Sequence, residues 1–290
     1  MKKRSLASGS WVSFSLPAIF FVTVFMLYPV VYSLVLSLYS HQGLTSTFVG
    51  LGNFKRLLSD SIFWNSLLNN VLFLAIQVPI MLLLGLLFAY LLQTDGLKCR
   101  GFFRMALFLP CITSLVAYSI VFRTMFQFDG LINSALQAIH VITEPIPWLT
   151  DKNWARALII MALCWRWTGY NAMYYIAGLQ NITRDTIEAA RMDGANKFQE
   201  FFHIVVPQLK QVIVFTSITS TIGTLQLFDE IANLTNGGPS NSTLTVALYT
   251  YQQSFLHANN FGYSAAISWV IVLMIAGLSL VQLRLTREES

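Results

Sequence analysis

The sequence has few charged residues and no cysteines at metal-binding spacing. Asp, Glu, Lys and Arg make up 11% of the 290 residues, whereas soluble domains carry about 25%. This shortage excludes an ordinary water-soluble protein, because much of the surface cannot face water. The three cysteines, Cys99, Cys111 and Cys164, form no CxxC pair and are odd in number. They therefore indicate neither a zinc site nor a disulfide framework.

Long apolar runs dominate the rest of the chain, which is 55% hydrophobic. A helix needs about 20 mostly apolar residues to cross a bilayer, and lipid offers no partner to backbone groups outside a helix. Six stretches meet this length: residues 12–38, 67–92, 102–126, 155–179, 211–231 and 261–283. The sequence therefore predicts an all-α integral membrane protein with six transmembrane helices in a single domain, residues 1–290. Prolines in or near these stretches predict kinks at Pro17, Pro29, Pro79 and Pro110.

Lysine and arginine set the expected topology, because cytoplasmic segments carry an excess of both. With the tail at residues 1–11 inside, the inner segments hold most of them: Lys2, Lys3, Arg4, Lys98, Arg100, Arg104, Arg184, Arg191, Lys197, Lys210, Arg284 and Arg287. The outer loops hold only Lys55, Arg56, Lys152 and Arg156. We therefore expect both termini in the cytoplasm, and we interpret the net charge of +5 as a topology signal rather than a sign of nucleic-acid binding.

One polar segment interrupts the apolar pattern on the inner side. It reads EAARMDGANKFQEFFHIVVPQLK from Glu188 to Lys210. Asp185 can cap a first helix with Glu188 as its capping-box partner, and Gly194 suits a left-handed stop at the end of that helix. A second helix is predicted to begin near Asn196. The segment is therefore expected to form two short helices joined at a glycine.

An aromatic stripe follows the predicted second helix. Phe198, Phe201, Phe202 and Val205 are spaced i, i+3, i+4 and i+7, which places them on one helical face. Pro207 then ends or kinks the helix. We expect aromatic rings on a polar loop to be covered by another surface, because exposed apolar patches mark interaction sites. The residues alone leave two alternatives open: a hairpin lying on the bilayer surface, or a docking element for a soluble partner.

The segment resembles the EAA loop of ABC importer permeases. The matching residues are Glu188-Ala189-Ala190, Asp193-Gly194-Ala195 and Val205-Val206-Pro207. Three further segments resemble the sugar-type subfamily, which includes the maltose-transporter large subunit and the glycerol-phosphate permeases: FVGLGNF at 48–54, AGLQNI at 177–182 and LFDEIANLTNGGP at 227–239. The resemblance covers nearly the whole chain. The extra N-terminal spans and large outer domain of the maltose subunit are absent.

This resemblance implies the type I permease fold of ABC importers and a division of labour between subunits. The loop at residues 181–208 would sit in a groove of a separate ATPase, which binds ATP and magnesium. The coupling residues implied are Glu188, Ala189, Ala190, Asp193, Gly194, Phe198, Phe201, Phe202 and Pro207. The other partners implied are a second, different permease subunit, two ATPase subunits and an extracytoplasmic binding protein that delivers a sugar or sugar derivative. The expected location is a bacterial cell membrane.

The chain itself carries no sign of a nucleotide site. Its nearest approach to a phosphate-binding loop runs from Gly96 to Gly101, and Phe102 and Phe103 stand where a lysine and a hydroxyl residue are required. The histidines are scattered and form no cluster with acids. We therefore predict no catalytic residue, no metal site and no cofactor in this chain.

The fourth predicted span carries a polar and aromatic face. Trp167, Tyr170, Asn171 and Tyr174 recur at i, i+3, i+4 and i+7, so they share one side of the helix. Aromatic rings can cover the apolar faces of a pyranose while an amide meets its hydroxyls. Helix-helix packing is an equally open alternative. The family resemblance favours a substrate path here, to which we add Tyr118 and Phe122 of the third span.

Arg166 lies within the fourth span, where a charge is costly and is expected to face the bundle interior or a water-filled cavity. A role in the substrate path and a structural role both remain open. One structural option is an ion pair with Asp229 or Glu230.

Two rival classes lack their characteristic residues. A secondary transporter driven by an ion gradient needs buried acidic groups, and no Asp or Glu lies in the middle of a predicted span. A membrane-embedded enzyme needs clustered His, Asp or Glu, which the sequence does not contain.

Overall fold

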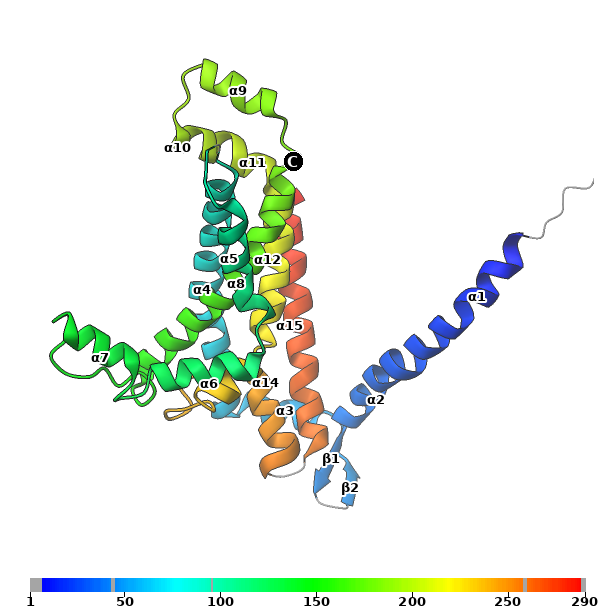
Figure 1. Cartoon of the computed structure of the whole chain (residues 1–290). Coiled ribbons are helices and arrows are strands. Elements are labelled where there is room, and N and C mark those ends of the chain that lie inside the picture. Colours follow the sequence, from blue (N-terminus) through cyan, green and yellow to red (C-terminus); the bar gives the residue numbers. More distant parts are fainter. Residues whose placement is uncertain (1–6, 43–44, 95, 258–259, 288–290) are drawn as a thin grey trace, which may run out of the picture. The chain divides into compact units, whose positions relative to one another are not determined.

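The computed structural model describes residues 7–42, 45–94, 96–257 and 260–287, and almost every element is a helix (Figure 1). The chain divides into two compact units. One comprises Met1–Asp60 with Thr250–Ile271, and the other comprises Ser61–Tyr249 with Val272–Ser290. The second unit holds most of the residues singled out above.

The first unit begins with a long apolar helix. It consists of α1 (Ala7–Val22), a π-helical turn (Thr23–Leu27) and α2 (Tyr28–Ser37). The strands β1 (Tyr39–Gln42) and β2 (Thr45–Phe48) follow as an antiparallel pair in which Tyr39 is opposite Phe48. Next comes α3 (Gly52–Leu58), whose buried Asn53 donates 2.8 Å hydrogen bonds to the carbonyls of Ser37 and Tyr39. This amide joins α3 to the end of α2.

The unit is completed by residues from the other end of the chain. After α14 (Val246–Tyr251) and a π-helical turn (Gln252–His257), α15 (Phe261–Arg287) begins. The Tyr263 hydroxyl donates to the Asp60 carboxylate. The Arg56 guanidinium lies 4.2 Å from the centre of the Tyr263 ring. The Trp269 indole donates to the Ser33 hydroxyl at 3.1 Å.

The second unit is built on two long helices, α4 (Ser61–Gln93) and α8 (Lys152–Leu179), which pack along each other. Small residues allow this approach. A Cβ at Gly85 of α4 would lie 3.3 Å from the backbone nitrogen of Ala172. A Cβ at Gly169 of α8 would overlap the Leu107 carbonyl of α5 (Arg100–Ile112). Gly85 and Gly169 therefore fix the distances between these three helices.

Two further helices of this unit depart from the predicted spans. The predicted span 102–126 is broken into α5 and α6 (Leu115–Met125), which meet at 98°. The break follows Pro110, where a kink was predicted, but its size exceeds a kink. The predicted span 211–231 ends early, because α12 (Lys210–Leu225) stops and a separate short helix, α13 (Asp229–Leu234), follows. Both breaks place irregular backbone beside α8.

The described residues include three helices long and apolar enough to cross a membrane: Ser15–Leu36, Ser61–Gln93 and Phe261–Arg284. Two bent helix pairs, Arg100–Ile112 with Leu115–Met125 and Lys197–Gln208 with Lys210–Leu225, would raise the count to five if each pair formed one span. The helix α8 stands where the fourth span was predicted and is less apolar. The arrangement is compatible with the predicted six-span membrane protein.

Buried amides hold the far end of α4 to the loop before α14. The Asn69 side chain donates to the carbonyls of Asn241 and Leu244 at 2.8 and 2.9 Å. The Asn70 amide donates to the Thr224 carbonyl at 2.9 Å and accepts from the Val246 backbone N–H at 2.9 Å. Both amides are almost fully buried. They form hydrogen bonds with backbone C=O and N–H groups at the end of α12 and in the loop that regular secondary structure leaves unpaired.

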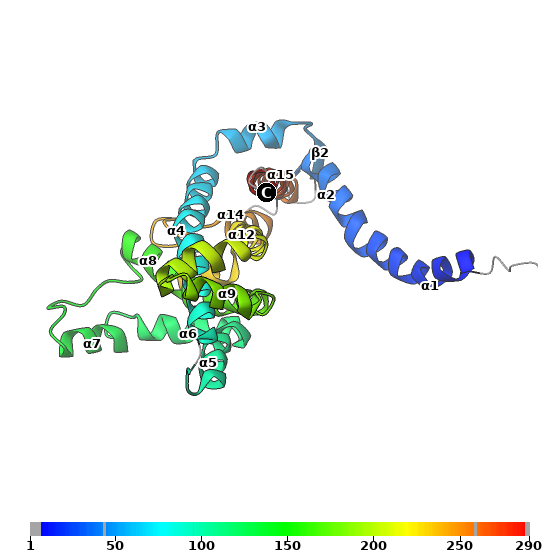
Figure 2. The same ribbon diagram turned by 90° about the horizontal axis from the view of Figure 1, so that it is seen from above.

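Between α6 and α8 a long loop contains one more helix, α7 (Leu131–Ala138). Its buried Asn133 accepts from the Trp148 indole at 3.0 Å and from the Ile146 backbone N–H at 3.1 Å. At the other end of α4 and α8, two short helices lie across the bundle end: α9 (Arg184–Met192) and α10 (Lys197–Glu200) (Figures 1 and 2). A π-helical turn (Phe201–Val205) and α11 (Val206–Gln208) then lead into α12.

Candidate functional site

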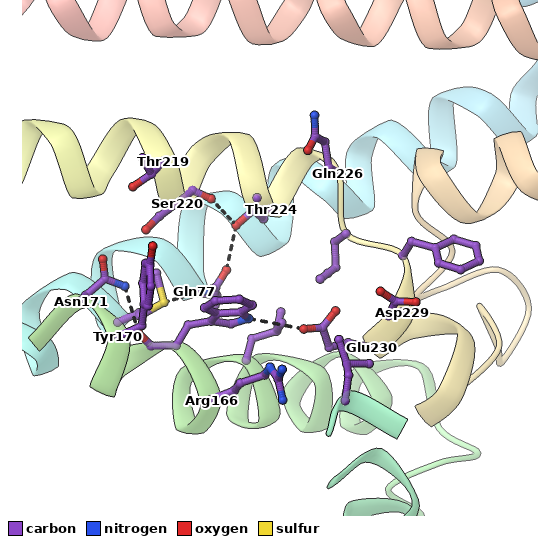
Figure 3. A pocket seen from close by; sticks show the side chains of 17 residues that line it. Gln77, Arg166, Tyr170, Asn171, Thr219, Ser220, Thr224, Gln226, Asp229 and Glu230 are labelled. Atoms are coloured by element: carbon purple, nitrogen blue, oxygen red, sulfur yellow. Dashed lines mark hydrogen bonds between the residues drawn. The ribbon is translucent and has the colours of Figure 1, made fainter. Parts of the chain in front are cut away.

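A cavity of about 430 Å³ lies within the second unit, between α4, α8, α12 and α13 (Figure 3). Tyr170 and Asn171 approach it from α8, while Thr219, Ser220 and Thr224 face them from α12. Its volume falls within the roughly 300–1,000 Å³ usual for small-molecule sites. All of its walls come from one compact unit, so the cavity belongs to a single packed body.

Four of the seven residues predicted for a substrate path line this cavity: Arg166, Trp167, Tyr170 and Asn171. Tyr174 lies one turn further along α8, and its hydroxyl is 2.9 Å from that of Tyr170. The helical face predicted from the spacing is therefore present, although the cavity covers only its first half.

The two residues predicted from the third span lie outside the cavity wall. Tyr118 is buried beneath Arg166, whose guanidinium is 4.9 Å from the centre of the ring. Phe122 packs against Trp165, with ring centres 5.2 Å apart. The 98° bend turns α6 away from the cavity, so that of this helix only Leu115 reaches the wall.

The aromatic wall presents ring faces and edges together. The rings of Trp167 and Tyr170 are 5.7 Å apart and nearly perpendicular. The Trp167 indole N–H donates to the Glu230 carboxylate at 3.3 Å. This hydrogen bond joins α8 to α13 and orients the indole. The pair supplies apolar surface of the kind that covers sugar rings.

Amides on α4 and α8 provide the polar contacts. The Gln77 carboxamide oxygen accepts from the Thr224 hydroxyl at 3.1 Å, and its nitrogen contacts the Met81 sulfur at 3.1 Å. The Asn171 amide donates to the Trp167 carbonyl at 3.0 Å. Its oxygen is buried and has no hydrogen-bond partner within the described part of the chain. A buried acceptor of this kind is costly unless a ligand or water pairs with it.

Arg166 is buried and binds the broken helix end instead of an acid. Its guanidinium donates to the Thr113 carbonyl at 3.0 Å and to the Pro110 carbonyl at 3.4 Å. The ion pair with Asp229 or Glu230, which was one structural option, does not form: among the described residues Arg166 is not in an ion pair with either acid. The break between α5 and α6 frees carbonyls beside Arg166, and these accept hydrogen bonds from its guanidinium.

Several cavity residues were not among the predicted set. Gln77 and Met81 come from α4, and Gln226, Asp229 and Glu230 follow α12. A glutamine inside the apolar run of α4 is a signal that the sequence offers for Gln77. Nothing local marks Glu230, which reaches the cavity because α12 ends at Leu225. Together the walls carry ring faces, amides, hydroxyls and charges of both signs, a set suited to a polyhydroxyl ligand.

The described residues contain no group of three or more His, Cys, Asp and Glu side chains that could hold a metal ion.

The second candidate region is the helical hairpin at residues 181–208. Its first helix, α9, begins at Arg184, one residue before Asp185, the residue expected as its cap. The N-cap is Thr183, and Asp185 lies within the first turn. The expected capping box of Asp185 with Glu188 is therefore wrong. Gly194 has a φ of +86°. The next residue closes the helix, because the Ala195 backbone N–H donates to the Ala190 carbonyl at 3.0 Å. The left-handed stop was predicted correctly.

The second helix of the hairpin begins where the sequence placed it. Asn196 caps α10, and its side-chain oxygen accepts from the Gln199 N–H at 2.9 Å. The Gln199 side chain accepts in return from the Asn196 N–H at 2.9 Å. This capping box fixes the angle at which the chain leaves the turn.

A buried carboxylate fastens the hairpin to α4. Glu200 accepts from Arg191 of α9 at 2.8 and 3.2 Å, and from the Tyr90 hydroxyl of α4 at 3.0 Å. Only 2% of its side chain is exposed. The Arg191 guanidinium, with help from the Tyr90 hydroxyl, lowers the pKa of the Glu200 carboxyl below its usual value. The two helices of the hairpin and α4 therefore share one charged contact.

The aromatic stripe divides between inside and outside. Val205 is buried against Leu86, Ala89 and Leu92 of α4, and the Phe201 ring is 5.1 Å from that of Tyr90. Phe198 and Phe202, however, are 69% and 46% exposed. The π-helical turn from Phe201 to Val205 shifts the register and separates the two pairs.

The outer face of the hairpin carries most of the other predicted coupling residues. Glu188, Ala189 and Asp193 are exposed, and Ala190 is half-buried. Met192, between them, is 88% exposed. Pro207 is exposed in α11, and the chain turns by 72° at Leu209 before α12 begins. This face combines the exposed acids Glu188 and Asp193 with the exposed apolar side chain of Met192, and no other part of the described chain covers it.

Comparison with known proteins identifies related chains. The family model for the binding-protein-dependent transport system inner membrane component matches residues 49–287. The chain is similar to the lactose transport system permease protein LacF of Rhizobium radiobacter, with 52% identity over 99% of this chain and 97% of the relative. It is also similar to the arabinooligosaccharides transport system permease protein AraP of Bacillus subtilis (strain 168), with 35% identity over 94% of this chain and 87% of the relative.

A solved structure has the same fold. One chain in the crystal structure of a bacterial ABC transporter that imports the acidic polysaccharide alginate matches with a TM-score of 0.81 and 19% identity. The match covers 96% of both chains. A second crystal structure, with similar scores, contains that transporter in complex with an alginate-bound periplasmic protein.

Proposed function

The chain belongs to the family of binding-protein-dependent transport system inner membrane components, and from this premise we propose that it imports a sugar or sugar derivative as one permease subunit of an ABC transporter. Its fold is that of type I importer permeases. The named relatives carry lactose and arabinooligosaccharides. The chemical class of their substrates agrees with the ring faces, amides and hydroxyls of the cavity.

The cavity forms part of the route of the substrate. Trp167 and Tyr170 provide ring surface, and the unpaired oxygen of Asn171 accepts a hydrogen bond from a sugar hydroxyl. Tyr174 extends the same face toward the hairpin end of α8. Arg166 acts by holding the broken end of α5 against α8 through the Pro110 and Thr113 carbonyls.

The hairpin receives motion from a separate ATPase subunit. Two features support this role: Phe198, Phe202 and Met192 present exposed apolar surface, and Glu200 ties the same hairpin to α4. The rigid turn at Gly194 keeps the two helices at one angle. The single observation that carries the proposal is that Phe198, Phe202 and Met192 are exposed on a hairpin that Glu200 anchors to α4, a helix that also lines the cavity.

The remaining partners complete an importer. They are a second, different permease subunit, two ATPase subunits that bind ATP and magnesium, and an extracytoplasmic binding protein. Both termini and the hairpin face the cytoplasm, because most lysines and arginines lie on that side. ATP binding closes the ATPase subunits, moves the hairpin and opens the cavity outward, so that the binding protein can deliver the sugar.

The proposal is tested by Gly194→Val and Glu188→Lys in the assembled transporter. At Gly194 a side chain meets open space but must adopt φ +86°, which strains a β-branched residue. Glu188→Lys reverses one charge on the exposed face. We expect each variant to lower ATP-dependent sugar uptake at least about tenfold, as about 1.4 kcal/mol of lost coupling would, and to reduce the ATPase that co-purifies.

The matched control is Gly50→Val, at a positive φ of +54° far from the hairpin in sequence. It carries a similar backbone strain and is expected to retain the ATPase. Unchanged uptake in both hairpin variants would refute the coupling role. Substrate flux through the purified chain without ATPase subunits would instead favour a self-sufficient transporter.

A further inference from the structure

An apolar groove of the second unit lies outside the candidate substrate route. It has a volume of about 720 Å³ and runs between the end of α4 and the start of α5. Its walls are apolar: Phe88, Leu91 and Leu92 from α4, and Phe103, Ala106 and Leu107 from α5. Leu91 and Phe103 are 48% and 45% exposed. The groove is therefore open at its side, where the surrounding bilayer would reach it.

One end of the groove is cationic. Lys197, the first residue of α10, is its only charged lining residue. It forms no ion pair with any residue that the structure describes. Arg100 lines the neighbouring cavity and donates to the Thr94 carbonyl at 2.8 Å. The Nε atoms of Arg100 and Arg104 are buried and lack a hydrogen-bond partner in the described residues.

The sequence of the connecting loop strengthens this charge. Between Thr94 and Arg104 it holds Lys98 as well as the two arginines, against a single acid, Asp95. A long apolar trough with cations at one end matches an amphiphile with an acyl chain and an anionic head. Basic pockets between transmembrane helices on the cytoplasmic side bind anionic lipid head groups, whereas a soluble anion would leave the apolar walls uncovered.

We propose that this groove binds one anionic phospholipid of the inner leaflet, with an acyl chain between α4 and α5 and its phosphate beside Lys197. The proposal rests on the inward-facing hairpin of the proposed function. Because Lys197 opens the second helix of the hairpin, the bound lipid contacts the coupling element directly. Arg100 and Arg104, in the first turns of α5, do not line the groove but add positive charge near the start of this helix.

The test uses the complete transporter in nanodiscs of phosphatidylcholine containing one-quarter phosphatidylglycerol, and native mass spectrometry counts the lipids that stay bound. Lys197→Gln removes the charge, and we expect about fivefold less retained phosphatidylglycerol, since one cation contributes about this factor at an anionic surface. Ala106→Trp fills the groove and should reduce retention of the same lipid to a similar or greater extent.

The matched controls are Lys152→Gln and Ala117→Trp, at exposed positions outside this groove. Both are expected to keep the wild-type lipid count. Equal phosphatidylglycerol retention by Lys197→Gln and its control would overturn the proposal, even if Ala106→Trp failed to fold. So would retention of phosphatidylcholine and phosphatidylglycerol by the wild type in the same three-to-one ratio as in the nanodisc. Lipid counting requires neither ATP nor substrate, so its outcome is independent of the transport proposal.

Discussion

The cavity and the hairpin use polar and apolar groups in opposite ways. The cavity is bordered by packed helices and leaves a buried polar atom, the Asn171 oxygen, without a hydrogen-bond partner among the residues that the structure describes. The hairpin buries the Glu200 carboxylate, which pairs with Arg191, on one side and leaves apolar rings such as Phe198 exposed. The ligand of the cavity would therefore supply a hydrogen-bond donor, and the partner of the hairpin would supply an apolar surface.

This difference separates the kinds of partner that each region can take. An unpaired acceptor in a closed space is satisfied by a small hydrogen-bonding ligand. Exposed rings on an ordered helix are covered by another protein surface, because aromatic residues are enriched at the centres of protein interfaces. Variants that change one region should therefore leave the readout of the other intact.

Among the variants that test this comparison, those in the cavity should have the largest effect. Asn171→Leu removes the unpaired acceptor, and Trp167→Ala removes a ring face together with the hydrogen bond to Glu230. We expect sugar uptake at saturating binding protein to fall about tenfold in each, equivalent to about 1.4 kcal/mol. The amount of co-purifying ATPase should not change.

Trp165→Ala is the matched control, because Trp165 lies on the same helix, is 45% exposed and packs against Phe122 outside the cavity. An equal loss of uptake in both tryptophan variants would mean that the aromatic face serves packing alone.

An intermediate effect is expected where the hairpin joins α4. Glu200→Gln replaces charge-assisted hydrogen bonds to Arg191 and Tyr90, which are worth about 1.5–3 kcal/mol for a buried acceptor. The melting temperature of the assembled transporter should therefore fall at pH 7. Glu188→Gln, at an exposed acid of the same hairpin, should leave it unchanged.

The same contact gives a pH dependence of known sign. Because folding lowers the pKa of Glu200 below 4.5, the carboxylate stabilises the folded state above that pH, and the stabilisation is lost as the pH falls through the folded-state pKa. The difference in melting temperature between wild type and Glu200→Gln should shrink on acidification below pH 4.5. A constant difference would show that the charge of Glu200 contributes nothing.

The smallest effect on stability is expected at the exposed rings. Phe198→Ala removes a ring that is 69% exposed, so the free energy of unfolding should change by no more than about 0.5 kcal/mol. The affinity for the ATPase should nevertheless fall, by less than about fivefold if Phe198 is an ordinary interface contact. Phe201→Ala, at the ring packed on Tyr90, should show the reverse pattern in thermal melting and ATPase binding.

Local signals in the sequence predicted the hairpin well. Gly194 and Asn196 act through their own backbone and nearest neighbours, so the turn and the second helix were placed correctly. The anchor was not foreseen, because Tyr90 and Glu200 are 110 residues apart and meet only when α4 packs against the hairpin. The π-helical turn also escaped prediction, and it decides which rings of the stripe face outward.

The cavity was predicted only in part, for a related reason. Helical spacing on α8 is a property of one element, and it placed Trp167, Tyr170 and Asn171 together. The sharp break after Ile112 and the early end of α12 depend on contacts between elements. Pro110 indicated a kink, but its size follows from Arg166, which captures the freed carbonyls from a different helix. Gln77 and Glu230 reach the cavity through these breaks.

The helix α4 has one further consequence. It runs without interruption through Pro79 for 33 residues, about 50 Å. At one end, Tyr90 donates a hydrogen bond to Glu200, and in the middle Gln77 lines the cavity. At the other end, Asn69 and Asn70 form hydrogen bonds with the loop before α14. Because α4 is one continuous helix held at three points, a displacement at its hairpin end also tilts its other end. This helix can therefore couple the opening of the cavity on one side of the membrane to its closing on the other side.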